Sequence, residues 1–202
     1  MPWSDLYYDI LREVGNIGAG NAATALAELV GQPITMRVPS VVWLPLNEVA
    51  AHLGGAEKPI AGILIGVEGQ APGTILFAIP LEQVAVLLDV LMPGSMQGGY
   101  PLGELECSAL SEIGNILAGA YLSSLSSFTL LSFRHSVPAL AIDMAGAVLD
   151  YVLAEFGSVA DQVLLIENQF ESREHEVTSY FFFVPRPSTL EKIFKALGVE
   201  TE

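Results

Sequence analysis

The sequence predicts an α/β fold made of one unit that occurs twice. Residues 9–39 return at residues 108–138 with the same amino acid at ten positions, under a constant shift of 99. Each copy has apolar residues at steps of three and four, which predicts a long helix. Each is followed further along by two short apolar runs joined by polar residues, which predicts a β-hairpin. Because hairpin strands are antiparallel and need covering, we expect a largely antiparallel sheet flanked by helices.

The first half is predicted to run helix, strand, short helix, hairpin and helix. Its long helix covers residues 4–29, with Ser4 as the N-cap and Gly31 as the stop signal. The elements that follow are an extended segment over 33–46, a short helix over 46–53, strands over 60–67 and 74–79, and a helix from Pro80 to Pro93.

The second half is predicted to repeat this order with one difference. Its elements are a long helix over 104–128, an extended segment over 130–140, a helix over 142–156, strands over 163–170 and 177–184, and a helix from Ser188 to Gly198. The helix over 142–156 is longer than its first-half counterpart, and Ser188 with Glu191 matches a capping box. The Gly-rich segment 94–103 reads as a linker. We expect a single domain made of two repeats, about 4–93 and 104–198.

Composition narrows the classes of protein and partner. The chain has 202 residues, 51% of them hydrophobic, which suffices for a substantial core and argues against disorder. Its net charge of −15 disfavours nucleic acid and anionic membranes as partners. The single cysteine, Cys107, cannot form an internal disulfide, and no signal peptide is recognisable, so we expect a cytoplasmic protein. Residues 113–133 are uncharged but contain Asn115 and five serines, so we expect a helix running into a strand and no membrane insertion.

Four side chains recur at fixed spacing in the two copies. They are Asp9, Glu13, Asn16 and Pro39 in the first, and Ser108, Glu112, Asn115 and Pro138 in the second. Steps of four and three place the first three of each set on one face of a helix. Asparagine and the neighbouring glycines are poor helix formers, so their repeated presence inside a helical pattern points to a functional reason.

The spacing [D/S]-x3-E-x2-N-x22-P resembles the signature of the CheC/CheX/FliY family. These proteins are phosphatases that dephosphorylate the chemotaxis response regulator CheY. The match is complete in both copies, and the resemblance extends over essentially the whole chain. It implies a pseudo-twofold α/β fold with a shared six-stranded sheet and the two long helices side by side. Neither half is then expected to fold well alone.

The resemblance also implies roles for the repeated residues. Hydrolysis of an aspartyl phosphate needs a water molecule held in line with the phosphorus. A carboxamide can accept from and donate to that water, so Asn16 and Asn115 are expected to orient it. Glu13 and Glu112 are expected to bind a lysine of the partner. The chain itself is expected to bind no cofactor or metal, because CheY carries the Mg²⁺ ion.

The other motif residues have supporting roles in this interpretation. Asp9 and Ser108 differ between the copies, which leaves room for unequal sites. Pro39 and Pro138 are expected to be architectural, ending a strand or fixing a turn.

The expected partners are phosphorylated CheY and, by the same resemblance, the receptor deamidase CheD. The helix after Leu140 has no counterpart of equal length in the first half. Asp143 and Asp150 in this region are therefore candidate CheD contacts. We expect a monomer. The alternative function is a non-catalytic module that binds CheY or CheD, or a flagellar switch component. FliM shares the fold without the Glu/Asn signature, and FliY carries added segments for which this chain has no room.

Two weaker patterns have simpler explanations. Residues 18–23 fit G-x-G-x-x-A, but this dinucleotide motif must follow a strand, and here it lies inside a helical pattern. Small residues that allow close helix packing explain it better. The histidines, His52, His135 and His175, have no metal-ligand spacing with each other or with Cys107, which we expect to be a small buried apolar residue.

Overall fold

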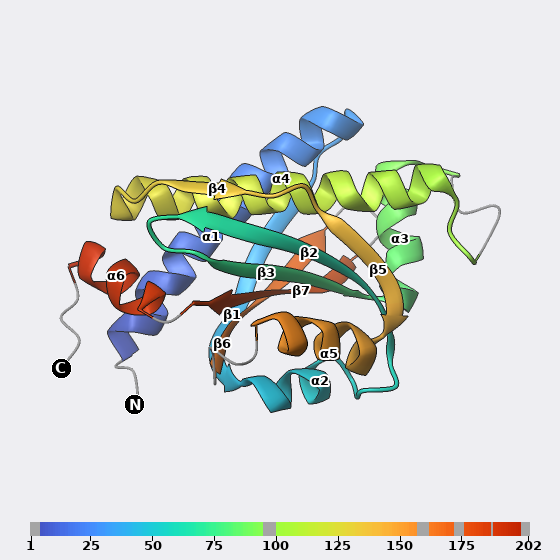
Figure 1. Ribbon diagram of the computed structural model, residues 1–202. Coiled ribbons are helices and arrows are strands. Elements are labelled where there is room, and N and C mark those ends of the chain that lie inside the picture. Colours follow the sequence, from blue (N-terminus) through green and yellow to red (C-terminus); the bar gives the residue numbers. More distant parts are fainter. Residues whose placement is uncertain (1–4, 95–99, 157–161, 172–175, 187, 199–202) are drawn as a thin grey trace.

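A seven-stranded sheet with helices on both faces forms the part of the chain that the structure describes (Figure 1). The structure is a computed structural model, and it describes residues 5–94, 100–156, 162–171, 176–186 and 188–198. All strand pairings within these residues are antiparallel. The predicted α/β class with a largely antiparallel sheet is confirmed.

The elements follow the predicted order. The first half consists of α1 (Asp5–Val30), β1 (Thr35–Pro45), a 3₁₀ turn η1 (Leu46–Glu48), α2 (Val49–His52), β2 (Pro59–Gly69), β3 (Gly73–Pro80) and α3 (Leu81–Leu91). The second half consists of α4 (Glu104–Thr129), β4 (Phe133–His135), β5 (Ala139–Met144), α5 (Ala145–Phe156), β6 (Gln162–Glu171), β7 (Glu176–Pro185) and α6 (Thr189–Ala196). The two long helices have equal length, 26 residues, and their bounds differ by the same 99 positions as the sequence repeat.

Each half places its first strand beside the hairpin of the other half. The sheet order is β1-β6-β7-β3-β2-β4, and β5 also pairs with β2. Val41 of β1 lies opposite Ile166 of β6, and the equivalent Leu140 of β5 lies opposite Ile63 of β2. The two hairpins meet at the centre through β3 and β7. The register of the sheet therefore has the pseudo-twofold relation of the sequence repeat.

Two apolar layers hold the helices to the sheet. One contains α1, α3, α4 and α6 with residues such as Leu26, Leu88 and Leu117. The other, on the opposite face, contains α2 and α5 with residues such as Val49 and Val152. Strand β3 is buried at all its positions because it is central in the sheet and covered on both faces. No helix in the described ranges is long and apolar enough to span a bilayer.

The sheet has seven strands where six were expected, because the second copy of the first strand is interrupted. β1 runs unbroken through Pro39, with a shift of register between Arg37 and Ser40. In the second copy, β4 ends at His135 and β5 begins at Ala139, so Pro138 lies in the gap. Proline has no amide hydrogen for strand pairing, which fits both irregularities.

Two predicted helix starts are wrong. The helix expected from residue 142 begins at Ala145, because Ile142 and Asp143 are still paired with β2 as part of β5. The capping box at the last helix does not form. Ser188 has a positive φ of 62° and makes no side-chain cap, and α6 begins at Thr189, whose hydroxyl donates to the carbonyl oxygen of Pro72 at 2.6 Å.

Candidate functional site

The motif of the first copy lies on the exposed face of α1. Asp9, Glu13 and Asn16 are all exposed, whereas Leu11 and Val14 between them are buried in the core. Because an α-helix has 3.6 residues per turn, the spacing in the sequence places the polar residues on one face and the apolar residues on another. The helix places these polar groups where a partner protein could reach them.

Asn16 is tied to the strand that follows its helix. Its carboxamide oxygen accepts a hydrogen bond from the backbone N–H of Val38 at 3.2 Å. Val38 is 4% exposed and packs against the backbone of Gly15. A carbonyl oxygen has two lone pairs, so this bond fixes the orientation of the carboxamide and leaves acceptor capacity. The amide hydrogens of Asn16 are not used in this bond.

The motif of the second copy lines a groove of about 350 Å³. The groove is lined by Ser108, Ser111, Glu112, Asn115, His135, Ser136, Val137 and Pro138, so it gathers all four residues of the second motif. Glu112 is exposed and Asn115 is partly exposed. Because Asn16 is exposed as well, neither of the two motif asparagines is fully buried.

The strand segment that borders the groove is anchored to β2. Ser136 is bonded to β2: its N–H donates to the carbonyl oxygen of Gly66, and its hydroxyl oxygen accepts from the Gly66 N–H, both at 2.9 Å. Val137, the equivalent of Val38, is 87% exposed. The two copies therefore have the same motif in two different surroundings.

Close packing of α1 on α4 sets the separation of the two motifs. A Cβ atom on Gly18 would lie 2.7 Å from Cδ1 of Tyr121 and 3.2 Å from its Cα, so glycine is needed for this approach. Nearby, the side-chain amide of Asn21 donates to the hydroxyl of Ser124 at 3.2 Å. The pattern at residues 18–23 lies within α1, as expected, and Gly18 serves helix packing.

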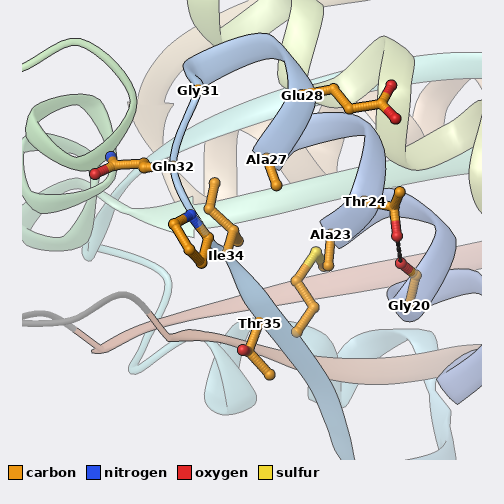
Figure 2. Close-up of a pocket in the computed structure, with 11 residues that line it drawn as sticks. Gly20, Ala23, Thr24, Ala27, Glu28, Gly31, Gln32, Ile34 and Thr35 are labelled. Carbon is orange, nitrogen blue, oxygen red and sulfur yellow. Dashed lines mark hydrogen bonds between the residues drawn. The ribbon is translucent and has the colours of Figure 1, made fainter.

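A second hollow on the described surface carries little chemistry. It holds about 600 Å³ between the last turns of α1 and the start of β1. Figure 2 shows small and apolar side chains along it, with the Glu28 carboxylate turned away. The Thr24 hydroxyl donates to the carbonyl oxygen of Gly20 within the same helix at 3.0 Å. None of the motif residues lines this hollow, so the smaller groove on α4 is the better candidate site.

The remaining candidate residues are placed as follows. Asp143 is exposed on β5 and Asp150 is exposed on α5. Cys107 is partly buried in the first turns of α4, so it is less enclosed than expected. His52 is exposed at the end of α2, and His175 lies outside the described residues. The described ranges contain no group of three or more His, Cys, Asp or Glu side chains that could hold a metal ion.

The residue that sequence reasoning missed is His135. It was considered only as a metal ligand, but it lines the groove beside Glu112 and Asn115. The 99-residue shift aligns it with Met36, which is 7% exposed. The replacement of an apolar methionine by an ionisable histidine at the equivalent position is the signal in the sequence that points to His135.

Known proteins resemble this chain in both sequence and fold. The model of the CheC-like family matches residues 8–43 and 105–142, which are the two copies of the repeat. The CheY-P phosphatase CheC of Bacillus subtilis is 38% identical over 194 residues, covering 94% of this chain and 93% of that protein.

Two solved structures have the same fold at low sequence identity. FliY of Thermotoga maritima matches with a TM-score of 0.76 and 24% identity, covering 98% of each chain. FliM in the FliM-SpeE complex from H. pylori matches with a TM-score of 0.72 and 12% identity, covering 97% of this chain and 96% of that one. The α/β architecture is thus the one that is also found in FliY and FliM. Within that class, the identity and coverage of the Bacillus relative show that this chain belongs to the CheC-like family.

Proposed function

We propose that this chain is a chemotaxis phosphatase that hydrolyses the aspartyl phosphate of phosphorylated CheY. The observation that carries the proposal is the presence of two Glu/Asn pairs at accessible, equivalent positions of two packed helices. The similarity to the CheY-P phosphatase CheC of Bacillus subtilis supports the choice of substrate.

The chemistry needs little more than an oriented water molecule. Phosphoryl transfer is accelerated mainly by positioning and by stabilisation of charge on the transferred group. Asn16 and Asn115 would each accept a hydrogen bond from the water through the carboxamide oxygen and donate one through the amide nitrogen. The charge stabilisation would come from the Mg²⁺ ion and lysine of CheY, so this chain would act without a metal of its own.

The carboxylates would fix the docking register. Glu13 and Glu112 each stand one helical turn before the asparagine of their pair, on the same exposed face. A charge-assisted hydrogen bond to a lysine of CheY would place the asparagine over the phosphoryl group. Pro39 and Pro138 would contribute only by shaping the chain next to the two asparagines.

The surface around β5 and α5 is proposed to bind CheD. Here Asp143 and Asp150 stand among exposed apolar side chains: Ile142 is 39%, Met144 50% and Tyr151 59% exposed. An apolar patch with charged neighbours is the usual composition of a protein interface. This surface includes an edge strand, β5, which lies at the far side of β2 from β3. We further propose that the protein works as a cytoplasmic monomer.

The competing function is a binding module without catalysis. The likeness to FliM supports it, because FliM has the same architecture. Phosphate release from phosphorylated CheY, measured with and without this protein in the presence of Mg²⁺, separates the two. Catalysis predicts many phosphates released per molecule of this protein. A rate equal to that of CheY alone, with complex formation intact, would establish the binding module instead.

A further inference from the structure

Beside the Glu/Asn pair, the second motif has a third polar side chain, the imidazole of His135. It comes from β4, a different element from the helix that carries the pair, and it lines the same groove as Glu112 and Asn115. A Cβ on Gly119, one turn beyond Asn115, would lie 3.8 Å from Nε2 of His135. The imidazole therefore rests over α4 one turn beyond Asn115, where it lines the groove.

The orientation of the ring leaves one nitrogen for a ligand. Nδ1 of His135 lies 3.1 Å from the carbonyl oxygen of Ser136. A carbonyl can only accept, so Nδ1 carries a hydrogen and donates it. Nε2 is then the nitrogen that gains a proton when the ring becomes charged, and it becomes a donor on the α4 side.

The first copy has an ion pair beside its motif that the second copy lacks. There, Arg12 donates to Asp9 at 2.8 Å, so an ion pair lies on the helix face that also carries Glu13. In the second copy both members of the ion pair are replaced by serines, Ser108 and Ser111. The second copy therefore has no permanent cation on its helix face.

His135 is the group that can supply this cation. The ionisable groups around its ring are Glu112 on α4, Arg134 on β4 itself, and Glu68 on β2, which lies opposite Arg134 in the strand register. Val67, the residue opposite His135, is apolar. Among the residues that line the groove, His135 is the one whose side chain can become positively charged. Imidazole is the side chain that changes charge between about pH 5 and pH 8.

We propose that His135 is a binding residue of the second site, and that its protonated ring donates a hydrogen bond to the phosphoryl group of the partner. This rests on the proposed function. A phosphoryl group carries negative charge into a groove that contains Glu112, on a chain of net charge −15. A donor with positive charge at Nε2 lowers the repulsion and adds a charge-assisted hydrogen bond. The first site has Met36 at the equivalent position, so it has no side chain there that can become positively charged.

The test compares the two sites within one protein. Asn16→Ala leaves the second site intact, and Asn115→Ala leaves the first, so the ratio of their activities cancels any effect of pH on CheY itself. As the pH falls from about 8 to about 6, kcat/KM of the second site relative to the first should rise about two- to fivefold, as befits an exposed charge pair. The change should lie mainly in KM, because the contact exists before the chemical step.

Matched variants assign the effect to His135. In the Asn16→Ala background, His135→Met, which copies the first site, should abolish the pH-dependent rise. His135→Gln should keep a donor but give a flat profile, and His52→Met, at an exposed histidine on α2, should leave the rise unchanged. A rise that persists in His135→Met, or a ratio that does not vary with pH, would overturn the inference.

Binding supplies a readout that does not depend on turnover. The double variant Asn16→Ala/Asn115→Ala should bind phosphorylated CheY more tightly at about pH 6 than at about pH 8, and His135→Met should remove this difference. An affinity with the same pH dependence in both proteins would refute the role of His135 even if the chain proved to be no phosphatase. Phosphate release absent from both single-site variants, with the pH effect on binding present, would instead refute the proposed function alone.

Discussion

Gly18 of α1 and Tyr121 of α4 are in contact without room for a methyl group between them, with only 2.7 Å from a Cβ on Gly18 to Tyr121 Cδ1. Tyr121 cannot easily move away. Its hydroxyl donates to the side-chain oxygen of Asn168, its ring lies 4.6 Å from that of Phe181 between centroids, and burial raises the pKa of its hydroxyl. This contact fixes how far apart the two helices, and therefore the two Glu/Asn pairs, are held.

The variant Gly18→Ala should therefore destabilise the protein although alanine is the better helix former. Overpacking against a fixed ring costs about 1–3 kcal/mol, and the gain in helix propensity offsets about 1 kcal/mol of it. We expect a net loss of up to about 2 kcal/mol in the free energy of unfolding, measured by denaturant titration.

Gly20→Ala is the matched control on the same helix. Nothing lies within 4 Å of a Cβ at this exposed position, so only the propensity gain remains and the variant should be slightly more stable. Equal stability of the two variants would show that the contact with Tyr121 does not limit the packing of α1 on α4.

The asparagines should control turnover and hardly affect docking. Asn16→Ala or Asn115→Ala removes one water-orienting group, so each single variant should keep the activity of its remaining site. The double variant should lose on the order of 10²-fold in kcat, a usual value for lost positioning, and still bind phosphorylated CheY. Asn47→Ala, at an exposed asparagine in η1, should release phosphate at the unmodified rate. Near-normal release by the double variant would mean that these side chains do not orient the water.

The glutamates should behave differently, because their proposed task is docking. In Glu13→Ala/Glu112→Ala a partner lysine loses its carboxylate, which weakens binding as well as turnover. We expect KM for phosphorylated CheY to rise about tenfold, and the affinity measured by titration to fall in parallel. Glu28→Ala, another exposed glutamate of α1, should change neither quantity. A variant with lowered kcat and unchanged affinity would assign the carboxylates to the chemical step.

Charge reversal at the edge of the sheet tests the CheD surface. Asp143→Lys places a cation between Ile142 and Met144 on β5, an element that carries neither Glu/Asn pair, and it should weaken CheD binding at least tenfold. Basal phosphate release should stay as it was. The comparison variant is Glu28→Lys, which also replaces a carboxylate by an ammonium group. It lies on α1, on the opposite face of the sheet, and should bind CheD normally. Normal binding by Asp143→Lys would exclude this surface.

Much of the fold follows from local patterns that the sequence displays directly. The stripe of apolar residues along α1 and α4 predicts both helices to within two residues at either end, and Gly31, with a φ of +70°, ends the first one as expected. The hairpins are equally visible, because polar residues separate two apolar runs in each half.

What was not predicted depends on contacts between distant segments. The pairing of Ile142 with Ala61 extends β5 and delays the start of α5, and no local preference of residues 142–144 indicates this. The same holds at the site. The bond from Val38 to Asn16 and the bonds from Ser136 to Gly66 decide which copy has an open groove, and both join residues more than 20 positions apart.

The exchange of first strands between the halves has a consequence for how such a chain could arise. Two separate copies of one half could build the same sheet as a symmetric dimer, with stability that depends on protein concentration. Tyr7 and Phe194, near opposite ends of the described chain, have ring centroids only 4.6 Å apart, so the first and last helices of the described chain are in contact. Joining the copies makes their association independent of concentration. It also allows the two copies to differ in sequence. In a symmetric dimer each residue occurs in both sites, whereas in the joined chain Met36 and His135 each belong to one site.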